Sequence, residues 1–173
     1  PIFVQFYIAI EPAYNKLFQN NGDLTFSDVT KTSGTEVLGI GSGVGNADLD
    51  DDGFLDLFLT NRTFYNSDKQ ITESDRNYLL RNKGNGNNWI KIELTGTKSN
   101  TNAYGARVKV MAGESIQYRE HTSAHGYNSA NDYRLHFGLA NEESIDSIEI
   151  IWPSGERQLL TDVAVNQTLS IEE

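Results

Sequence analysis

Apolar and polar residues alternate along the second half of the chain, which is the pattern of β-strands with one buried face. In the segment 90–95, every second residue is apolar, and the residues between them are Lys91, Glu93 and Thr95. Similar strands are predicted at 107–111, 115–119, 148–152 and 159–171, with turns at 112–114 and 153–156. Many short strands separated by turns predict a small antiparallel β-sandwich or barrel over residues 89–173.

The N-terminal segment is apolar throughout instead of alternating. Residues 2–10 are rich in β-branched and aromatic types and lie between Pro1 and Pro12. Such a run predicts one strand that is buried on both faces. No neighbouring segment is an obvious hairpin partner, so residues 1–12 are interpreted as a strand that is available to another subunit.

Residues 15–26 carry a hairpin pattern, with an Asn-Gly turn between two short strands. The pattern N-x-L-Φ-x-N-x-G begins at Asn15 and recurs from Asn77, in each case ahead of Asp or Asn. Repetition at this distance predicts a repeat architecture, in which each unit is one supersecondary element such as a four-stranded propeller blade. The polar segment 62–76 is predicted to be a loop.

An acidic segment lies between a glycine-alternating stretch and an apolar run, which predicts strand, turn, strand. It contains the spacing D-x-D-x-D-G-x-x-D. Carboxylates this close repel one another unless a cation lies between them, and calcium prefers such a ring of oxygen ligands. We therefore predict a Ca²⁺ site formed by the side chains of Asp48, Asp50, Asp52 and Asp56 and the main-chain carbonyl of Phe54.

This predicted site differs from the helix-flanked calcium loop of an EF-hand. Leu59 occupies the position where an EF-hand has a bidentate Glu, and both flanks read as strands. Asp51 falls between the predicted ligands and is expected to face solvent. The alternative interpretation is an acidic hairpin tip that is solvated and holds no metal.

Different parts of the chain resemble two known families. The stretches NKLFQNNGDLTFSDVT and DLDDDGFLDLFLTN make residues 13–88 resemble an FG-GAP/VCBS-type repeat, which implies a calcium-binding β-propeller blade. The stretches NWIKIELTGTKSNTNAYGARVKV, HGYNSANDYRLHFGLA and IEIIWPSGERQLLTDV make residues 89–173 resemble the ASPIC/UnbV domain, which implies an extracellular or surface module. The chain holds one full FG-GAP-like repeat and the start of another, whereas a closed propeller needs about four to eight blades.

Composition narrows the classes of function. The chain has 173 residues, of which 38% are apolar, so it is long enough for one large or two small domains with real cores. A net charge of −10 argues against binding to nucleic acid or to anionic lipid. The chain has no Cys, which excludes disulfides, thiolate zinc sites and cysteine nucleophiles. No apolar run is long enough to span a membrane as a helix.

Other candidate sites lack a complete motif. His121 and His125 are four residues apart, but the H-E-x-x-H pattern of zinc enzymes is absent. No nucleophile elbow or phosphate-binding loop is present, and no motif singles out a carboxylate pair for hydrolysis. Tyr104 and Tyr127 are candidates for stacking on sugars, or for half-buried positions in the β domain.

The predicted function is that of an all-β, non-enzymatic, calcium-binding structural or adhesion module at the cell surface or outside the cell. Calcium is expected to stabilise the fold by binding to the folded acidic turn. Partners are expected to be other copies, joined by strand addition through residues 2–10 into an oligomer or filament, or other surface proteins. Two alternatives are a calcium-dependent carbohydrate-binding module and a fragment of a larger β-propeller surface protein.

Overall fold

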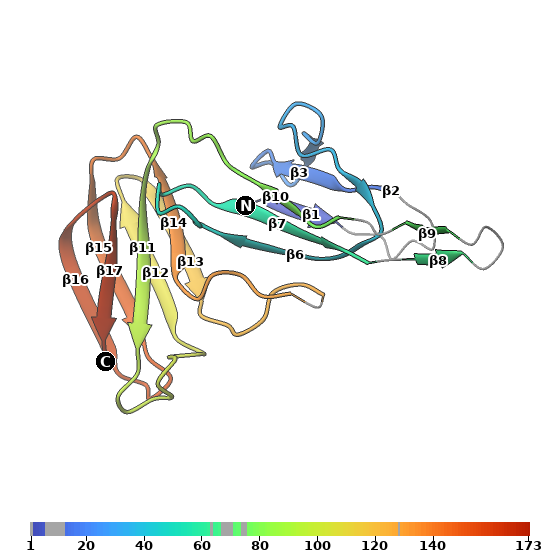
Figure 1. The fold of residues 1–173 in the computed structure, drawn as a ribbon. Coiled ribbons are helices and arrows are strands. Elements are labelled where there is room, and N and C mark those ends of the chain that lie inside the picture. The colour runs from blue at the N-terminus through green and yellow to red at the C-terminus, as the bar shows by residue number, and fades with distance from the viewer. Residues whose placement is uncertain (1, 6–12, 63, 67–70, 74–75, 128) are drawn as a thin grey trace. The chain divides into compact units, whose positions relative to one another are not determined.

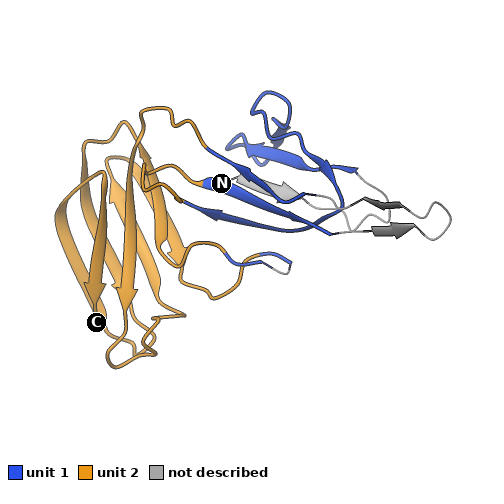
Figure 2. Cartoon of the chain, viewed as in Figure 1, with its two compact units in different colours: residues 1–47, 56–81, 126–130 blue, residues 48–55, 82–125, 131–173 orange. Residues whose placement is uncertain are grey.

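The computed structural model describes residues 2–5, 13–62, 64–66, 71–73, 76–127 and 129–173. Every regular element in these ranges is a β-strand (Figure 1), which confirms the predicted all-β fold. None of the described segments forms a helix that could cross a membrane. The chain divides into two compact units (Figure 2). Unit 1 comprises residues 1–47, 56–81 and 126–130, and unit 2 comprises residues 48–55, 82–125 and 131–173.

Unit 1 contains small antiparallel sheets. One has the strand order β1-β3-β4, and another has the order β10-β7-β6. Their bounds are β1 (Ile2–Gln5), β3 (Lys16–Asn20), β4 (Phe26–Asp28), β6 (Gly41–Ala47), β7 (Asp56–Asn61) and β10 (Tyr78–Leu80). Two further pairs join β2 (Ala13–Tyr14) to β5 (Leu38–Gly39) and β8 (Phe64–Asn66) to β9 (Ile71–Glu73). The last pair lies in the segment predicted as a loop, so that prediction is wrong for residues 64–66 and 71–73.

The N-terminal strand has a partner within the chain. β1 pairs antiparallel with β3, from Ile2 opposite Gln19 to Gln5 opposite Lys16. The premise that this strand lacks a partner is therefore wrong for Ile2–Gln5, because a strand 11 residues or more downstream supplies its ladder. The rest of the predicted strand, residues 6–10, lies outside the described residues.

The sequence repeat corresponds to a repeated local structure. In the first copy, the Asn20 side-chain oxygen accepts a hydrogen bond from the Gly22 amide at 2.8 Å. In the second copy, the Asn82 side-chain oxygen accepts one from the Gly84 amide at 3.0 Å. Both glycines have positive φ, 86° and 70°, which a residue with a side chain rarely adopts. Each copy thus ends its strand with the same Asn-x-Gly turn.

Unit 2 consists of two sheets. One has the strand order β14-β11-β17 and the other has the order β13-β12-β15-β16 (Figure 1). Their bounds are β11 (Asn88–Thr95), β12 (Arg107–Ala112), β13 (Ser115–Glu120), β14 (Leu135–Ala140), β15 (Ser144–Ile151), β16 (Arg157–Ala164) and β17 (Gln167–Glu172). β11 and β17 run parallel, whereas the sequence predicted only antiparallel pairing, because hairpin patterns report only neighbours in sequence.

The core of unit 2 lies between its two sheets. Ile90 and Ile92 of β11, Phe137 of β14 and Ile148 and Ile150 of β15 are all fully buried in one cluster. The alternation predicted for β11 and β15 is therefore confirmed on the apolar face. Neither sheet closes on itself among the described strands, so this unit is a sandwich rather than a barrel.

Candidate metal centre

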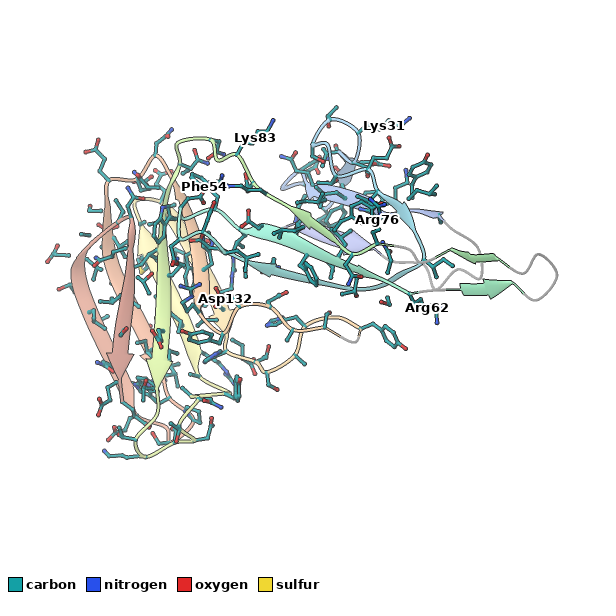
Figure 3. All side chains as sticks on the ribbon, viewed as in Figure 1. Lys31, Phe54, Arg62, Arg76, Lys83 and Asp132 are labelled. Carbon is teal, nitrogen blue, oxygen red and sulfur yellow. The ribbon has the colours of Figure 1, made fainter. Side chains whose placement is uncertain are left out.

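The acidic loop connects β6 to β7, as the strand–turn–strand prediction requires. These strands pair antiparallel, and their ladder ends at Ala47 opposite Asp56. The loop itself, residues 48–55, belongs to unit 2. Figure 3 draws its side chains and labels Phe54. Gly53 has a φ of 91° and Asp51 a φ of 56°, so the backbone turns through two left-handed positions.

Asp48 holds the loop in its turned shape. Its side chain is fully buried, with 0% of its surface exposed. One oxygen, Oδ1, accepts a hydrogen bond from the Asp52 amide at 3.0 Å, and Oδ2 accepts one from the Gly53 amide at 2.9 Å. The Phe54 amide in turn donates to Asp52 Oδ1 at 3.0 Å. The first predicted ligand therefore also caps the backbone of the loop.

Three of the predicted ligands come together. One carboxylate oxygen each from Asp48, Asp50 and Asp52 lies within 4.8 Å of the others, close enough to hold one metal ion. Asp48 is buried in this group, whereas Asp50 is exposed. Asp56 is the first residue of β7, is 3% exposed and is not a member of this group. The ligand roles of Asp56 and of the Phe54 carbonyl stay predictions.

A lysine that the sequence pattern did not single out contacts one of these carboxylates, that of Asp48, and the neighbouring Asp51. Lys91 Nζ lies 2.7 Å from Asp48 Oδ2 and 2.7 Å from Asp51 Oδ1, and its side chain is 1% exposed. Burial lowers the pKa of Lys91, but the hydrogen bonds to Asp48 and Asp51 raise it more, so its pKa lies above the ordinary value. The ammonium group is thus a built-in counter-ion for the loop.

The burial of Lys91 departs from the simple alternation of β11. Ile90 and Ile92 point into the core, so Lys91 points to the opposite face of the sheet. That face would be solvated in an isolated strand, but the loop 48–55 covers it. The only sequence signal for this contact is a cationic residue in a strand of a chain rich in acids, which is too common to be specific.

Arg134 adds a second cation at the edge of the loop. Its guanidinium group contacts both carboxylate oxygens of Asp132, which is labelled in Figure 3, with the shortest distance 2.7 Å. It also donates to Asp51 Oδ1 at 3.0 Å and to the Asp48 carbonyl at 3.3 Å. The hydrogen bond to Asp132, and then that to Asp51, raises the pKa of Arg134.

Asp51 faces solvent as expected, since 72% of its side-chain surface is exposed, but it is not isolated there. Its Oδ1 accepts from Lys91 at 2.7 Å and from Arg134 at 3.0 Å. These hydrogen bonds, that from Lys91 first, lower the pKa of Asp51. Asp51 therefore bridges two cationic side chains that come from β11 and from the segment just before β14.

Aromatic residues fix the middle of the loop. The Gly53 carbonyl accepts a hydrogen bond from His136 Nε2 at 2.8 Å, and the His136 ring stacks on Trp89 at 6.5 Å between centroids. A Cβ atom at Gly53 would lie 1.8 Å from Trp89 Nε1, so the indole leaves no room for a side chain. Burial lowers the pKa of His136. The glycine is required by space as well as by its positive φ.

The two histidines at zinc-like spacing do not join the carboxylate group. His121 is 3% exposed, and neither of its ring nitrogens has a hydrogen-bond partner among the described residues. The rings of His121 and Tyr104 pack edge to face, with their centroids 5.1 Å apart. Burial lowers the pKa of His121. His125 Nε2 instead contacts Thr122 Oγ1 at 2.9 Å. Tyr104, a candidate for sugar stacking, is thus engaged in an aromatic contact within unit 2.

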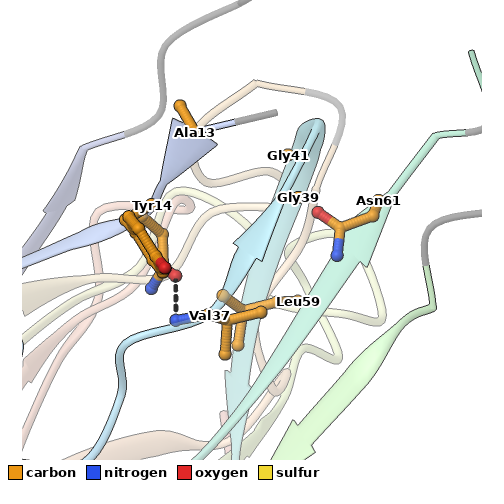
Figure 4. A pocket seen from close by; sticks show the side chains of 8 residues that line it. Ala13, Tyr14, Val37, Gly39, Gly41, Leu59 and Asn61 are labelled. Atoms are coloured by element: carbon orange, nitrogen blue, oxygen red, sulfur yellow. Dashed lines mark hydrogen bonds between the residues drawn. The ribbon is translucent and has the colours of Figure 1, made fainter. Parts of the chain in front are cut away.

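Unit 1 has a separate small pocket between β2, β5 and β7 (Figure 4). Asn15 lines it, but the side chain of Asn15 is already engaged. Its oxygen accepts from the Val37 amide at 2.9 Å, the dashed line in Figure 4, and its nitrogen donates to the Thr35 carbonyl at 3.0 Å. No charged side chain or histidine is among the described residues that line the pocket.

Comparison with known proteins bears on both halves of the chain. Residues 96–173 match the family described as ASPIC and UnbV. The chain is also similar to cartilage acidic protein 1 of Mus musculus and Homo sapiens, at 28% identity over 154 residues, which is 82% of this chain. The protein of that name from Xenopus tropicalis is 26% identical over 174 residues, which is 92% of this chain.

These matches confirm the ASPIC/UnbV resemblance for the C-terminal part of the chain. The similarity to cartilage acidic protein 1 covers 82% to 92% of the chain. It therefore extends beyond residues 96–173, which the family match covers, into the N-terminal part. The chain spans about a fifth to a quarter of the length of these curated relatives, 21% to 24%. The FG-GAP/VCBS resemblance of residues 13–88 stays a prediction.

Proposed function

We propose that this chain is a non-enzymatic calcium-binding module of an extracellular or cell-surface protein. The observation that carries the proposal is the convergence of oxygens from Asp48, Asp50 and Asp52 within 4.8 Å on one turn. The turn is held in shape by the backbone hydrogen bonds to Asp48. A preformed turn lowers the ordering cost of binding, so the cation would meet its ligands already assembled.

The chemistry of the ligands favours calcium over other metals. The group consists of carboxylates alone, which are hard oxygen donors that suit Ca²⁺, Mg²⁺ and Mn²⁺ better than Zn²⁺ or Cu²⁺. A short loop of several carboxylates, able to add a main-chain carbonyl and water, matches the irregular coordination of calcium. Magnesium demands a near-octahedral shell and gives up its water reluctantly, so it is expected to bind more weakly.

The similar proteins and the charge of the chain support the proposed location outside the cell. The similar proteins carry a name that refers to cartilage, a tissue rich in extracellular matrix, and to an acidic protein. This chain is itself acidic, with a net charge of −10. Outside the cell, free calcium is about millimolar, the range of extracellular calcium modules. Strand addition through Ile2–Gln5 is not part of the proposal, because these residues already pair with β3.

Isothermal titration calorimetry tests the proposal. Protein freed of metal with a chelator is titrated with CaCl₂ and, in a parallel run, with MgCl₂. The expected result is one calcium site per chain and a weaker or undetectable response to magnesium. Asp50→Ala should abolish the calcium signal, because it removes one of the three converging carboxylates.

Glu114→Ala is the matched control, because it removes the same charge at an exposed turn outside the loop. It should leave the calcium signal unchanged. Calcium binding that persists unchanged in Asp50→Ala would place the ion elsewhere, and no binding to the native chain would overturn the proposal.

A further inference from the structure

Lys91, the buried lysine of β11, contacts Asp48, the predicted metal ligand whose carboxylate also holds the backbone of the loop. Lys91 Nζ lies 2.7 Å from Asp48 Oδ2, and that oxygen also accepts the Gly53 amide. The other oxygen, Oδ1, accepts the Asp52 amide. Both oxygens of Asp48 are therefore engaged before any metal arrives, and one of them by a full positive charge.

A cation and an ammonium group make opposing demands on one carboxylate. Each is attracted by the same negative charge, and two positive charges a few ångströms apart repel strongly where water is excluded. Lys91 and Asp48 are 1% and 0% exposed, so solvent screens little of this repulsion. Calcium can bind only if it tolerates the ammonium beside it or if the ammonium moves away from Asp48.

Neither route is free of cost. Lys91 cannot simply move to solvent, because its side chain is enclosed, with Trp89 at 5.1 Å from Nζ and the loop on the other side. If it leaves Asp48, it keeps its second contact, to Asp51 Oδ1 at 2.7 Å, on the exposed side of the loop. Asp51 is not one of the converging carboxylates, so it offers the ammonium a position off the ligand.

We propose that Lys91 is an internal competitor for the metal, so that cation binding at this loop exchanges the Asp48 ammonium contact for a metal contact. This inference rests on the proposed calcium site and assigns to it a device that sets its affinity. The competition weakens calcium binding and at the same time keeps the loop folded when calcium is absent. The loop would then respond to high calcium concentrations and would not depend on calcium for its shape.

Arg134 does not have the same role. Its guanidinium group contacts the carboxylates of Asp132 and Asp51 and the carbonyl of Asp48, and neither of these two carboxylates belongs to the converging group. It anchors the loop from outside the ligand group. The competing charge is therefore assigned to Lys91, which contacts the Asp48 carboxylate itself.

The test compares calcium affinities of the native chain and of Lys91→Gln by calorimetry with CaCl₂. Glutamine removes the charge but keeps a hydrogen-bond donor toward Asp48. The variant should bind calcium about tenfold more tightly or better, because the ammonium no longer opposes the ion. Its melting temperature in chelator should fall, and calcium should raise that temperature by more than it does for the native chain.

Lys98→Gln is the matched control. Lys98 also lies in unit 2 and is 63% exposed, and its ion pair is with Glu156, outside the loop. This variant makes the same change in net charge, so a general electrostatic effect would appear in both variants. The competitor model predicts a gain in affinity for Lys91→Gln that Lys98→Gln does not share.

Four outcomes separate the two proposals. A gain specific to Lys91→Gln supports both, and equal affinities with a native site intact overturn the competitor model only. Binding by Lys91→Gln with none by the native chain supports the competitor and overturns the proposed function. No binding by either overturns both. If Lys91→Gln does not fold in chelator, Lys91→Arg is measured instead. It keeps the charge, so the competitor model predicts an affinity close to that of the native chain, and tighter calcium binding by Lys91→Arg would overturn the model.

Discussion

Unit 2 contains two turns that are built around a carboxylate, and they neutralise that carboxylate in different ways. In the loop 48–55, Asp48 accepts two backbone amides and a buried ammonium. In the turn after β11, Glu173 Oε2 accepts the amides of Thr97, Lys98 and Ser99 at 3.0, 2.9 and 2.7 Å. Hydroxyl groups of Ser99 and Ser154 complete the second turn.

The difference follows from exposure. Around Glu173, amide and hydroxyl dipoles suffice, because water still reaches the site and screens the charge. The carboxylate of Asp48 is cut off from water, so dipoles alone leave it under-compensated and a full positive charge is needed. Lys91 supplies that charge from within the chain, and calcium is the external cation proposed to replace it. The half-buried carboxylate of Glu173 has no such requirement.

The largest effect in this comparison is expected from removing the buried charge. Asp48→Asn, measured in chelator, should destabilise the protein by about 3 kcal/mol, because it leaves Lys91 buried with only Asp51 as its anion. Asp50→Asn is the matched control: the same chemical change at an exposed position should cost less than about 0.5 kcal/mol. Urea unfolding measures both, and equal costs would contradict the account of Asp48.

A somewhat smaller effect is expected at the glycine of the loop. Gly53→Ala should cost about 2–3 kcal/mol, since it combines a strained φ with a clash against Trp89. Gly155→Ala separates these causes, because Gly155 has nearly the same φ, 92°, and nothing within 4 Å of an added Cβ. It should cost about 1 kcal/mol. If both variants lose the same stability in a thermal melt, Trp89 does not confine the loop as described.

The smallest effect is expected at the half-buried Glu173, and it depends on pH in the acid range. Desolvation raises the pKa of Glu173, but hydrogen bonds from Ser154, Ser99 and Lys98 outweigh it and lower that pKa to about 2. The folded state thus resists protonation, so this contribution to stability is complete above about pH 4.5 and is lost as the pH falls toward about 2. Glu173→Gln should lower the melting temperature at neutral pH by less than Asp48→Asn does.

The melting temperatures of Glu173→Gln and of the native chain at acid pH give a second test of the role of Glu173. Between about pH 4.5 and pH 2, the melting temperature of Glu173→Gln should fall less steeply than that of the native chain, because the titrating group is gone. Parallel curves for the two proteins would show that Glu173 and its hydrogen bonds do not contribute to acid stability.

Local patterns in the sequence predicted much of this structure. Alternation located the core-facing residues of β11 and β15, and the Gly-rich stretch, the acidic loop and the apolar run correctly gave β6, the turn and β7. The spacing of Asp48, Asp50 and Asp52 correctly placed three carboxylates together. These features depend on strand period and turn geometry, which act over a few residues.

Features made by distant parts of the chain were not predictable in the same way. Lys91 looks like a solvated strand residue until the loop 43 residues earlier covers it. The partner of β1 and the parallel pairing of β11 with β17 also join segments that no hairpin pattern connects. The proposed site illustrates this limit, because its ligands follow a local motif whereas its counter-ion comes from tertiary packing.

The measurement that tests the central claim most directly is a thermal melt of the native chain and Asp50→Ala, with millimolar calcium and with chelator. The account predicts that calcium raises the melting temperature of the native chain, and that Asp50→Ala loses this rise while melting normally in chelator. A native chain whose melting temperature is the same in both conditions would contradict a calcium site at Asp48, Asp50 and Asp52. Lys91 and Arg134 would then be the counter-ions of a purely structural turn.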